Sequence, residues 1–303
     1  MPTPKVYSAA KRYGGFGVQS AVGTPATTPT FLPIVRSQTK FKNELNIQEQ
    51  KYATGDYFIT VDGIPVEPRT SGVVVAPFSP TVLNAFLAAC CLATGPLIAP
   101  VPITWFQGNG FDEDVFSDMF FNGGTIVVSG QQPAQINFNF VGITESTSAA
   151  ARTASVPTYE RPYRISNVQG ATMLGDAVDR FSSITIRIMS AIQLYFGSRN
   201  DGSSYASDTI LEELGAAADI VRAYNSATQK AAFLNECGAP GAIVLPFVST
   251  CGATHSHTFT FPNALYQARD TDAQDNAPIA ELLTFLGLRA TVSPYSPLTL
   301  AAA

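Results

Sequence analysis

The chain has 303 residues, which is long enough for two domains of ordinary size, and 46% of the residues are hydrophobic while only 14% are charged. This composition excludes an intrinsically disordered chain. So low a charge density suits a subunit that buries much of its surface against other subunits. The net charge of −5 argues against a nucleic-acid binder that works by neutralising phosphates.

Residues 1–38 are rich in Gly, Thr and Pro and show little periodicity, so they predict an extended N-terminal arm without a core of its own. Four apolar residues favour docking of this arm on another surface: Phe16, Phe31, Leu32 and Ile34. No apolar run follows the basic residues near Met1, so no secretory signal is expected.

Residues 39–143 predict a first module of strands around one helix. Alternation of apolar and polar residues from Phe41 to Glu49 predicts a half-buried strand, and Asp62-Gly63 predicts a tight turn. Ser79 followed by Pro80 predicts a helix start. The apolar stripe of that helix is Val82, Leu83, Phe86, Leu87 and Cys90. Further strands are predicted at Val73–Ala76, Ile103–Phe106, Thr125–Ser129 and Gln135–Ile143.

The hydrophobic stretch Thr81–Val101 is too short for a membrane span, because Gly95-Pro96 breaks it after about 14 helical residues, short of the roughly 20 needed. Between two strands, Phe111–Phe121 carries Asp112, Glu113 and Asp114 without the spacing of a calcium loop, so a solvated acidic loop is expected.

Residues 144–165 are rich in Ser, Thr, Ala and Pro and predict a linker, followed by a second module over residues 166–292. Alternation of Ile with Thr, Arg and Met from Ile184 to Met189 predicts a strand that continues to Phe196 before a turn at Asn200-Asp201-Gly202. Asn225 or Ser226 predicts a cap for a second helix whose face holds Phe233, Leu234 and Cys237. Further strands are predicted at Ala242–Val248, His257–Phe261, Ala264–Arg269 and Glu281–Leu288, and residues 293–303 predict a flexible tail.

Three short matches in the same order indicate that the two modules are copies. Ala85-Phe86-Leu87 with Cys90 returns as Ala232-Phe233-Leu234 with Cys237, 147 positions later (232 − 85). The segment from Pro133 to Gly142 returns from Pro278 to Gly287, 145 positions later (278 − 133). Phe121-Asn122-Gly123-Gly124 lies opposite Phe261-Pro262-Asn263-Ala264, 140 positions later (261 − 121). A mainly β fold with one short helix per module, an α+β arrangement of two tandem modules, follows from this pattern.

The sequence offers little chemistry. His255 and His257 share one face of a predicted strand, but no third metal ligand is evident apart from Cys251, so a surface pair is preferred to a metal site. Cys90, Cys91, Cys237 and Cys251 form no ligand cluster and are expected to be free thiols. No nucleophile elbow or phosphate-binding loop is present, so we expect no enzyme activity and no cofactor.

Several segments resemble the tail tube proteins of long-tailed bacteriophages. These are Tyr13–Ser20 with Gly23-Thr24-Pro25, Gly124–Gly130 leading into Phe138–Gly142, and the closing Asn263–Tyr266 and Leu283–Gly287. The resemblance implies a β-sandwich or half-barrel module flanked by one helix, six of which close a ring, with rings stacked into a tube for viral DNA. Two modules per chain then imply a trimeric ring with pseudo-six-fold symmetry; if only one module forms the wall, six chains are needed.

The resemblance also implies partners and contact residues. The partners are further copies of the chain, the tape-measure protein, and the tail terminator and distal tail proteins, in a virion assembled in the bacterial host cytoplasm without a membrane. DNA passes without specific binding, which mild acidity permits. Contacts between subunits or rings are expected at the arm and at Asn109–Phe121, through Phe16, Phe31, Leu32, Ile34, Asp112, Glu113, Asp114 and Phe116. Alternatives are a tail terminator, a capsid-decorating protein or a sugar-binding module; for the last, the single Trp105 is expected in the core.

Overall fold

The computed structural model describes residues 12–51, 60–92, 94–109, 111–130, 132–153, 160–197, 206–223, 240–249, 255–272, 280–293 and 295–302. Within these residues the protein is built almost entirely of antiparallel strands, with one α-helix and one short 3-10 turn. The mainly β fold class predicted from the sequence is therefore confirmed. We call residues 12–153 the first half and residues 160–302 the second half.

The first half holds nine strands and the helix in its described residues: β1 (Tyr13–Val18), β2 (Thr30–Leu32), β3 (Lys40–Lys51), β4 (Thr60–Pro77), α1 (Pro80–Cys90), β5 (Gly95–Pro96), β6 (Ile103–Gly108), β7 (Asp112–Ser129), β8 (Gln135–Gly142) and β9 (Thr147–Ala150). The second half holds η2 (Ile165–Asn167), β10 (Thr172–Met173), β11 (Asp176–Ala177), β12 (Phe181–Tyr195), β13 (Asp208–Ala223), β14 (Gly241–Ser249), β15 (His255–Asp272), β16 (Ala280–Gly287) and β17 (Thr299–Ala302).

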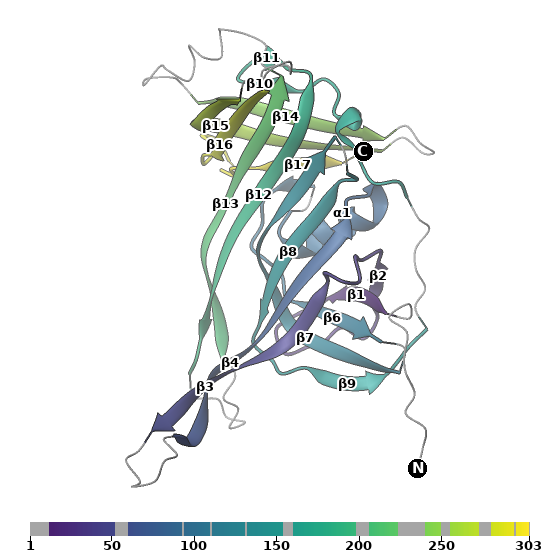
Figure 1. Cartoon of the computed structure of the whole chain (residues 1–303), viewed down its shortest axis with the longest axis vertical. Helices are drawn as coiled ribbons and strands as arrows, with labels where there is room; N and C mark the ends of the chain where they lie inside the picture. Colours follow the sequence, from purple (N-terminus) through teal and green to yellow (C-terminus); the bar gives the residue numbers. More distant parts are fainter. Residues whose placement is uncertain are drawn as a thin grey trace.

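Eight strands from both halves form one continuous antiparallel sheet, which we call the wall sheet. Its order is β3-β4-β8-β7-β12-β13-β16-β15. The long strands β4, β8, β12 and β13 follow the long axis of the molecule, and the β3–β4 hairpin extends beyond its lower end (Figure 1). The two halves are joined inside this sheet, where β7 pairs with β12.

Each half adds a second, smaller layer behind the wall sheet. In the first half its order is β2-β1-β6-β7-β9, and in the second half it is β11-β10-β14-β15-β17. The 18-residue strands β7 and β15 belong to both layers. Each changes register on β8 or β16 at one place, after Phe121 in β7 and after Tyr266 in β15, as expected where a strand bends between layers.

Large aromatic side chains fill the space between the layers. In the first half Trp105 stacks on Phe41 at 4.7 Å between ring centroids, and both side chains are buried. Trp105 thus lies in the core, as predicted. Alternation along the strands explains this packing, because successive side chains of a strand point to opposite faces and only one face meets the core.

Helix α1 covers one end of the first-half core. It begins directly after Ser79 with Pro80 at its first position, as predicted, although the Ser79 side chain makes no capping hydrogen bond. Phe86, Leu87 and Cys90 are all buried in the core. The helix ends at Cys90, ahead of Gly95-Pro96.

Three local predictions are wrong. Phe111–Phe121 is no loop, because β7 runs from Asp112 and pairs with β6, β9 and β8. Asp62-Gly63 is no turn, since both residues lie within β4 opposite Gln50 and Glu49. The described part of residues 293–303 is not a loose tail: β17 pairs with β15 and β5, and Leu298 and Leu300 are buried. In each case pairing with a distant strand overrides the local composition.

Some of the remaining predictions concern residues that the structure describes, and others lie outside the described residues. The predicted linker at residues 144–165 contains β9, which pairs with β7. The predicted strands at His257–Phe261 and Ala264–Arg269 are one continuous strand, β15. The second helix with Phe233, Leu234 and Cys237, the turn at Asn200-Asp201-Gly202, and Cys251 all lie outside the described residues.

Candidate assembly surfaces

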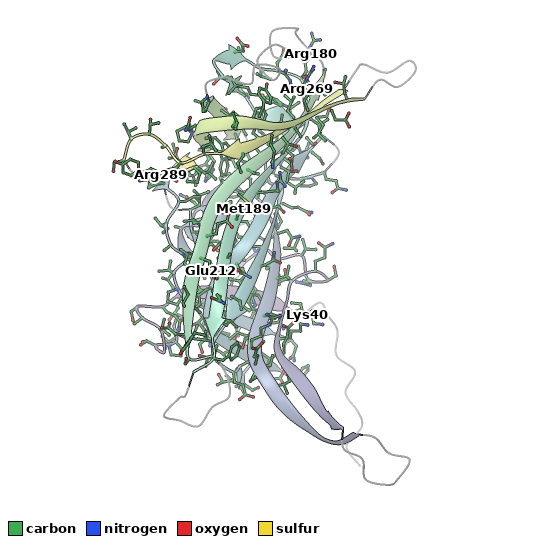
Figure 2. The ribbon with its side chains drawn as sticks, turned by 90° about the vertical axis from the view of Figure 1, so that its left-hand side faces the viewer. Lys40, Arg180, Met189, Glu212, Arg269 and Arg289 are labelled. Atoms are coloured by element: carbon green, nitrogen blue, oxygen red, sulfur yellow. The ribbon has the colours of Figure 1, made fainter. Side chains whose placement is uncertain are left out.

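One face of the wall sheet packs on the core and the other, which we call the outward face, does not. The outward face carries the alternate residues of each strand. Its polar and small members include Lys40, Lys42, Glu44, Arg69, Ser71, Asn137, Asn139, Thr125, Thr185, Arg187, Asp219, Thr284 and Asp270, and its apolar members include Val73, Val127, Met189, Val221, Leu265, Leu282 and Leu286. Figure 2 shows the molecule with Lys40 and Met189 labelled along these strands. Polar residues predominate on this face from β3 to β12, whereas Leu265 and Leu282 are exposed on it near the β15 edge.

Ion pairs tie together much of the charge on the outward face. Glu44 accepts from Lys42 at 2.8 Å and from Arg69 at 3.0 Å. The Lys42 side chain is the main cause of a Glu44 pKa lowered to about 2. Farther along the sheet, Arg187 pairs with Asp219 at 3.0 Å. Both signs of charge are therefore interspersed, and the face presents no strongly basic surface to a polyanion.

The described part of the N-terminal arm docks on its own chain. Strand β1 pairs with β6 along its whole length, and Phe16 is buried against Phe86 at 5.1 Å between ring centroids. After β1, the Gly23 N–H donates to Asp118 Oδ1 at 2.7 Å and the Ala26 N–H donates to Thr104 Oγ1 at 2.8 Å. These contacts hold the arm against the smaller layer of the first half.

The three acidic residues at the start of β7 differ sharply in environment. Asp112 is exposed and Asp114 is half-buried, but Glu113 is fully buried. Its carboxylate accepts from Arg152 Nη2 at 2.7 Å and from the Tyr13 hydroxyl at 2.8 Å. Burial and the neighbouring Asp112 raise the pKa of Asp114. A uniformly solvated acidic segment is therefore wrong for Glu113, which instead anchors the arm to β7.

The sequence-derived contact residues thus separate into two groups. Phe16, Leu32, Glu113 and Phe116 are buried within the chain itself. Phe31, Ile34, Asp112 and Asp114 retain exposed surface that a neighbouring subunit could cover. The contact role predicted for all eight remains a prediction.

The histidine pair lies at the start of β15, and its members have different surroundings. His257 is buried, and its Nδ1 lies 2.8 Å from the Tyr163 hydroxyl. Burial, with a smaller contribution from His255, lowers the His257 pKa to about 4. His255 is half-buried. Within the described ranges no three His, Cys, Asp or Glu side chains gather as a metal site would require.

Cys90 and Cys91 are free and buried, as predicted for these two residues. Burial raises the pKa of both thiols well above the ordinary value, so little thiolate forms at neutral pH.

The surfaces that sequence patterns missed are the edges of the sheets. Among the described residues β3 pairs with β4 alone, and the Leu265–Asp272 part of β15 pairs with β16 alone. Strand β9 pairs with β7 alone, and its four residues are exposed. Edge position depends on which strands become neighbours, so no periodicity could reveal it; only the charges of β3 hinted at an edge strand.

The wall sheet has two free edges among the described residues, and an unpaired edge is a template for another strand. Comparison with known families assigns the chain to a class of protein. A family model described as "Phage tail tube protein" matches residues 9–282, and the chain belongs to this family. A search of curated proteins found no match. None of the helices in the described part of the chain is long and apolar enough to span a membrane.

Membership makes the chain a structural protein of the bacteriophage tail, in a family that is not enzymatic and whose members assemble into a tube. The resemblance noted in the sequence is confirmed.

Proposed function

We propose that three copies of the chain close into one ring of the tail tube, with the wall sheet as the tube wall and the outward face toward the lumen. The observation that carries this proposal is the continuity of the wall sheet across both halves through the β7–β12 pairing. Three sheets of eight strands make a closed barrel of 24 strands, which leaves no unpaired edge in the wall.

The two halves contribute equivalent sets of strands to this wall. In each half a long hairpin (β3–β4 or β12–β13) is followed by a strand that pairs with its second member (β4–β8 or β13–β16). That strand pairs in turn with a long bent strand (β8–β7 or β16–β15). The shared order supports two tandem copies and a trimeric ring with pseudo-six-fold symmetry over a ring of six chains, each with one half in the wall.

The lumen lining suits passage of DNA during ejection. A duplex carries a dense row of phosphates, and a basic wall would bind them and slow the DNA. The ion pairs Lys42–Glu44, Arg69–Glu44 and Arg187–Asp219 leave few free cations on the outward face for phosphates to bind.

The module equivalence also points to subunit contacts at Asp112 and Asp114. When the 145-position offset between β8 and β16 is carried over to β7 and β15, the positions of Asp112 and Asp114 hold His257 and Phe259, whose rings lie 5.7 and 6.0 Å from that of Phe78 in the first half. Asp112 and Asp114 accordingly face the second half of the neighbouring chain in the ring. The half-exposed arm residues Phe31 and Ile34 then lie at the outer contacts between rings.

Stacking of rings uses the β3–β4 hairpin, because it is the part of the wall that projects beyond the body (Figure 1). Tube length and ends require further proteins: the tape-measure protein inside the lumen, and the tail terminator and distal tail proteins at the ends. Assembly takes place in the host cytoplasm.

Electron microscopy of the purified protein tests this function. We expect hollow filaments of constant diameter whose end-on averages show three-fold symmetry with six similar lobes. Replacement of residues 47–65 by an Asn-Gly turn, which joins the paired Asn46 and Val66 directly, should yield separate rings. Protein that stays monomeric, or six chains per ring, would contradict the proposal.

A further inference from the structure

The pairing between the two halves of one chain shows how halves of different chains can pair. Strand β7 of the first half runs antiparallel to β12 of the second half, from Gly124 opposite Ile188 to Ser129 opposite Ser183. We call this pairing of β7 with β12 the internal seam. It joins the strands of the first half to those of the second half, and its register is known residue by residue.

Every strand of this seam has a counterpart in the other half. On β7 and β8, Phe121 lies opposite Phe140; on β15 and β16, Tyr266 lies opposite Phe285, each 145 positions later (266 − 121 and 285 − 140). The register shift follows at once in both places. Strand β15 is thus the counterpart of β7, and the 140-position match of Phe121 with Phe261 is superseded.

Strand β3 is the counterpart of β12 by the same test. Lys40 lies opposite Val73 in the first hairpin, and Thr185 lies opposite Asp219 in the second, 145 and 146 positions later (185 − 40 and 219 − 73). Both hairpins also change register farther along, after Glu44 and after Ala191.

Resting on the ring proposed above, we propose that β15 of one chain pairs antiparallel with β3 of the next chain in the register of the internal seam. The register follows when each residue of β7 is replaced by its counterpart in β15, 145 positions later, and each residue of β12 by its counterpart in β3, 145 positions earlier. It places Arg269 opposite Asn43, Asp270 opposite Lys42, and Thr271 opposite Phe41. The partner for each edge is a second copy of this chain.

The two edges are available and complementary in charge. Lys42 is 53% exposed on a strand whose second edge is unpaired in the described residues, and Asp270 is exposed on an equally unpaired stretch of β15. Directly opposite residues of antiparallel strands have Cβ atoms about 5 Å apart, within reach of a salt bridge. At the internal seam the same positions hold Arg187 and Thr125. Lys42 would then bridge Glu44 of its own strand and Asp270 of the neighbour.

A second contact at the internal seam supports the same geometry. Strand β17 of the second half pairs with β5 of the first half, and Leu300 is buried there. In the first half the counterpart of β17 is β9, which pairs with β7 as β17 pairs with β15. All four residues of β9 are nevertheless exposed. The unmatched edges β3 and β9 both belong to the first half, as expected if they meet the second half of another chain.

Paired cysteines test the register in assembled protein. In the variant Lys42→Cys with Asp270→Cys, oxidation should give an interchain disulfide and a ladder that ends at the covalent trimer on a non-reducing gel. The matched control is Glu44→Cys with Asp270→Cys, a slip of two residues that moves one Cα by about 7 Å along the strand, beyond disulfide reach. Cross-linking of the control instead of the first pair, or a ladder that continues to six, would overturn the inference.

Charge reversal provides a second measurement that does not depend on disulfide geometry. Lys42→Asp sets a like charge opposite Asp270 and should reduce assembly by about tenfold. Lys42→Asp with Asp270→Lys should restore it, with circular dichroism checking that each subunit is folded. Failure of the double variant to recover, with folded subunits, would refute the pairing. If the wild-type protein forms tubes but the variant Lys42→Cys with Asp270→Cys gives no cross-link, only this register is refuted. If the wild-type protein forms no tubes, the ring itself is refuted.

Discussion

The first and second halves share one order of strand pairing but bury different chemistry at equivalent positions. In the second half, Arg222 and Glu281 lie opposite each other on β13 and β16, and both side chains are essentially inaccessible to water. The Arg222 guanidinium donates to Glu281 at 3.0 Å, and Arg269 donates to the other carboxylate oxygen. In the first half the corresponding pair on β4 and β8 is Ala76 and Ile136, both fully buried.

This difference shows that the strand pairing shared by the two halves does not require one kind of buried side chain. What the halves share is alternation, which sends every second side chain inward and makes a slip of one residue costly. A buried Arg–Glu–Arg cluster satisfies the inward positions only because each charge has a partner, whereas Ala and Ile need none. The two halves therefore share one arrangement of strands but bury two different sets of side chains in it.

The largest effect on stability is expected from removing Glu281, the carboxylate that Arg222 and Arg269 share in the second half. Glu281→Leu removes the carboxylate that the buried Arg222 and the nearly buried Arg269 share, so we expect a loss of about 3–5 kcal/mol in the free energy of unfolding. Chemical denaturation of the unassembled subunit measures it. The variant Arg222→Ala with Glu281→Ile copies the Ala76–Ile136 pair and should recover part of the loss, because Arg269 has still lost its bond to Glu281. If it is no more stable than Glu281→Leu, the equivalence of the two sites is wrong.

The next largest effect is in the pH dependence of the second half. Because burial lowers the folded-state pKa of His257 to about 4 from 6.5, the unfolded chain binds the extra proton first. The His257 contribution is complete above pH 6.5 and is lost as pH falls toward 4, by at most about 3 kcal/mol.

Unfolding midpoints measured from pH 7 to 4 test this, with His257→Gln as the variant that cannot titrate there. The first half carries Asp112 at the matching position of β7, so its stability gains nothing from this source. An unchanged pH profile in His257→Gln would show that His257 does not carry the effect.

A smaller loss is expected from the buried acid of the first half. Glu113→Ala removes the acceptor for Tyr13 and Arg152, but the Arg152 side chain is 34% exposed and can turn to water. We therefore expect a loss of about 1–3 kcal/mol, measured by the same denaturation. The neighbouring exposed Asp112→Ala is the control and should change stability by less than about 0.5 kcal/mol. Equal losses in the two variants would contradict the anchoring of the arm by Glu113.

The smallest effect concerns the cysteines. Since burial raises the pKa of Cys90 and Cys91, both thiols should resist alkylation in the folded protein and react quickly after denaturation. Mass spectrometry of the peptides measures labelling at each position. The repeat predicts similar protection for Cys237, and rapid native labelling of Cys237 alone would show that the two halves differ there.

Local sequence signals predicted the parts of the fold that depend on neighbours in the chain. Alternation found β3 and β12, and Ser79-Pro80 marked the start of α1 within one residue. The same signals did not predict β13, because Leu214-Gly215-Ala216-Ala217-Ala218 has neither alternation nor β-branched residues. That segment is held as a strand by β12 on one edge and β16 on the other.

The candidate surfaces show the same division. The apolar contact residues of the arm could be named from sequence, but the burial of Phe16 and Leu32 in their own chain could not. Likewise, three consecutive acids have one local signature, and only the approach of Tyr13 and Arg152 distinguishes Glu113 from Asp112. A side chain's exposure depends on what packs over it from far along the chain.

By itself, the amino-acid sequence determined the mainly β class of fold and the family, because these depend on short-range periodicity and motif spacing. The tertiary structure decided which strands are neighbours, and hence the continuous wall, its free edges and its paired charges. Pairing partners lie up to about 200 residues apart, as with Pro96 of β5 and Thr299 of β17, and no local pattern encodes a contact of that range.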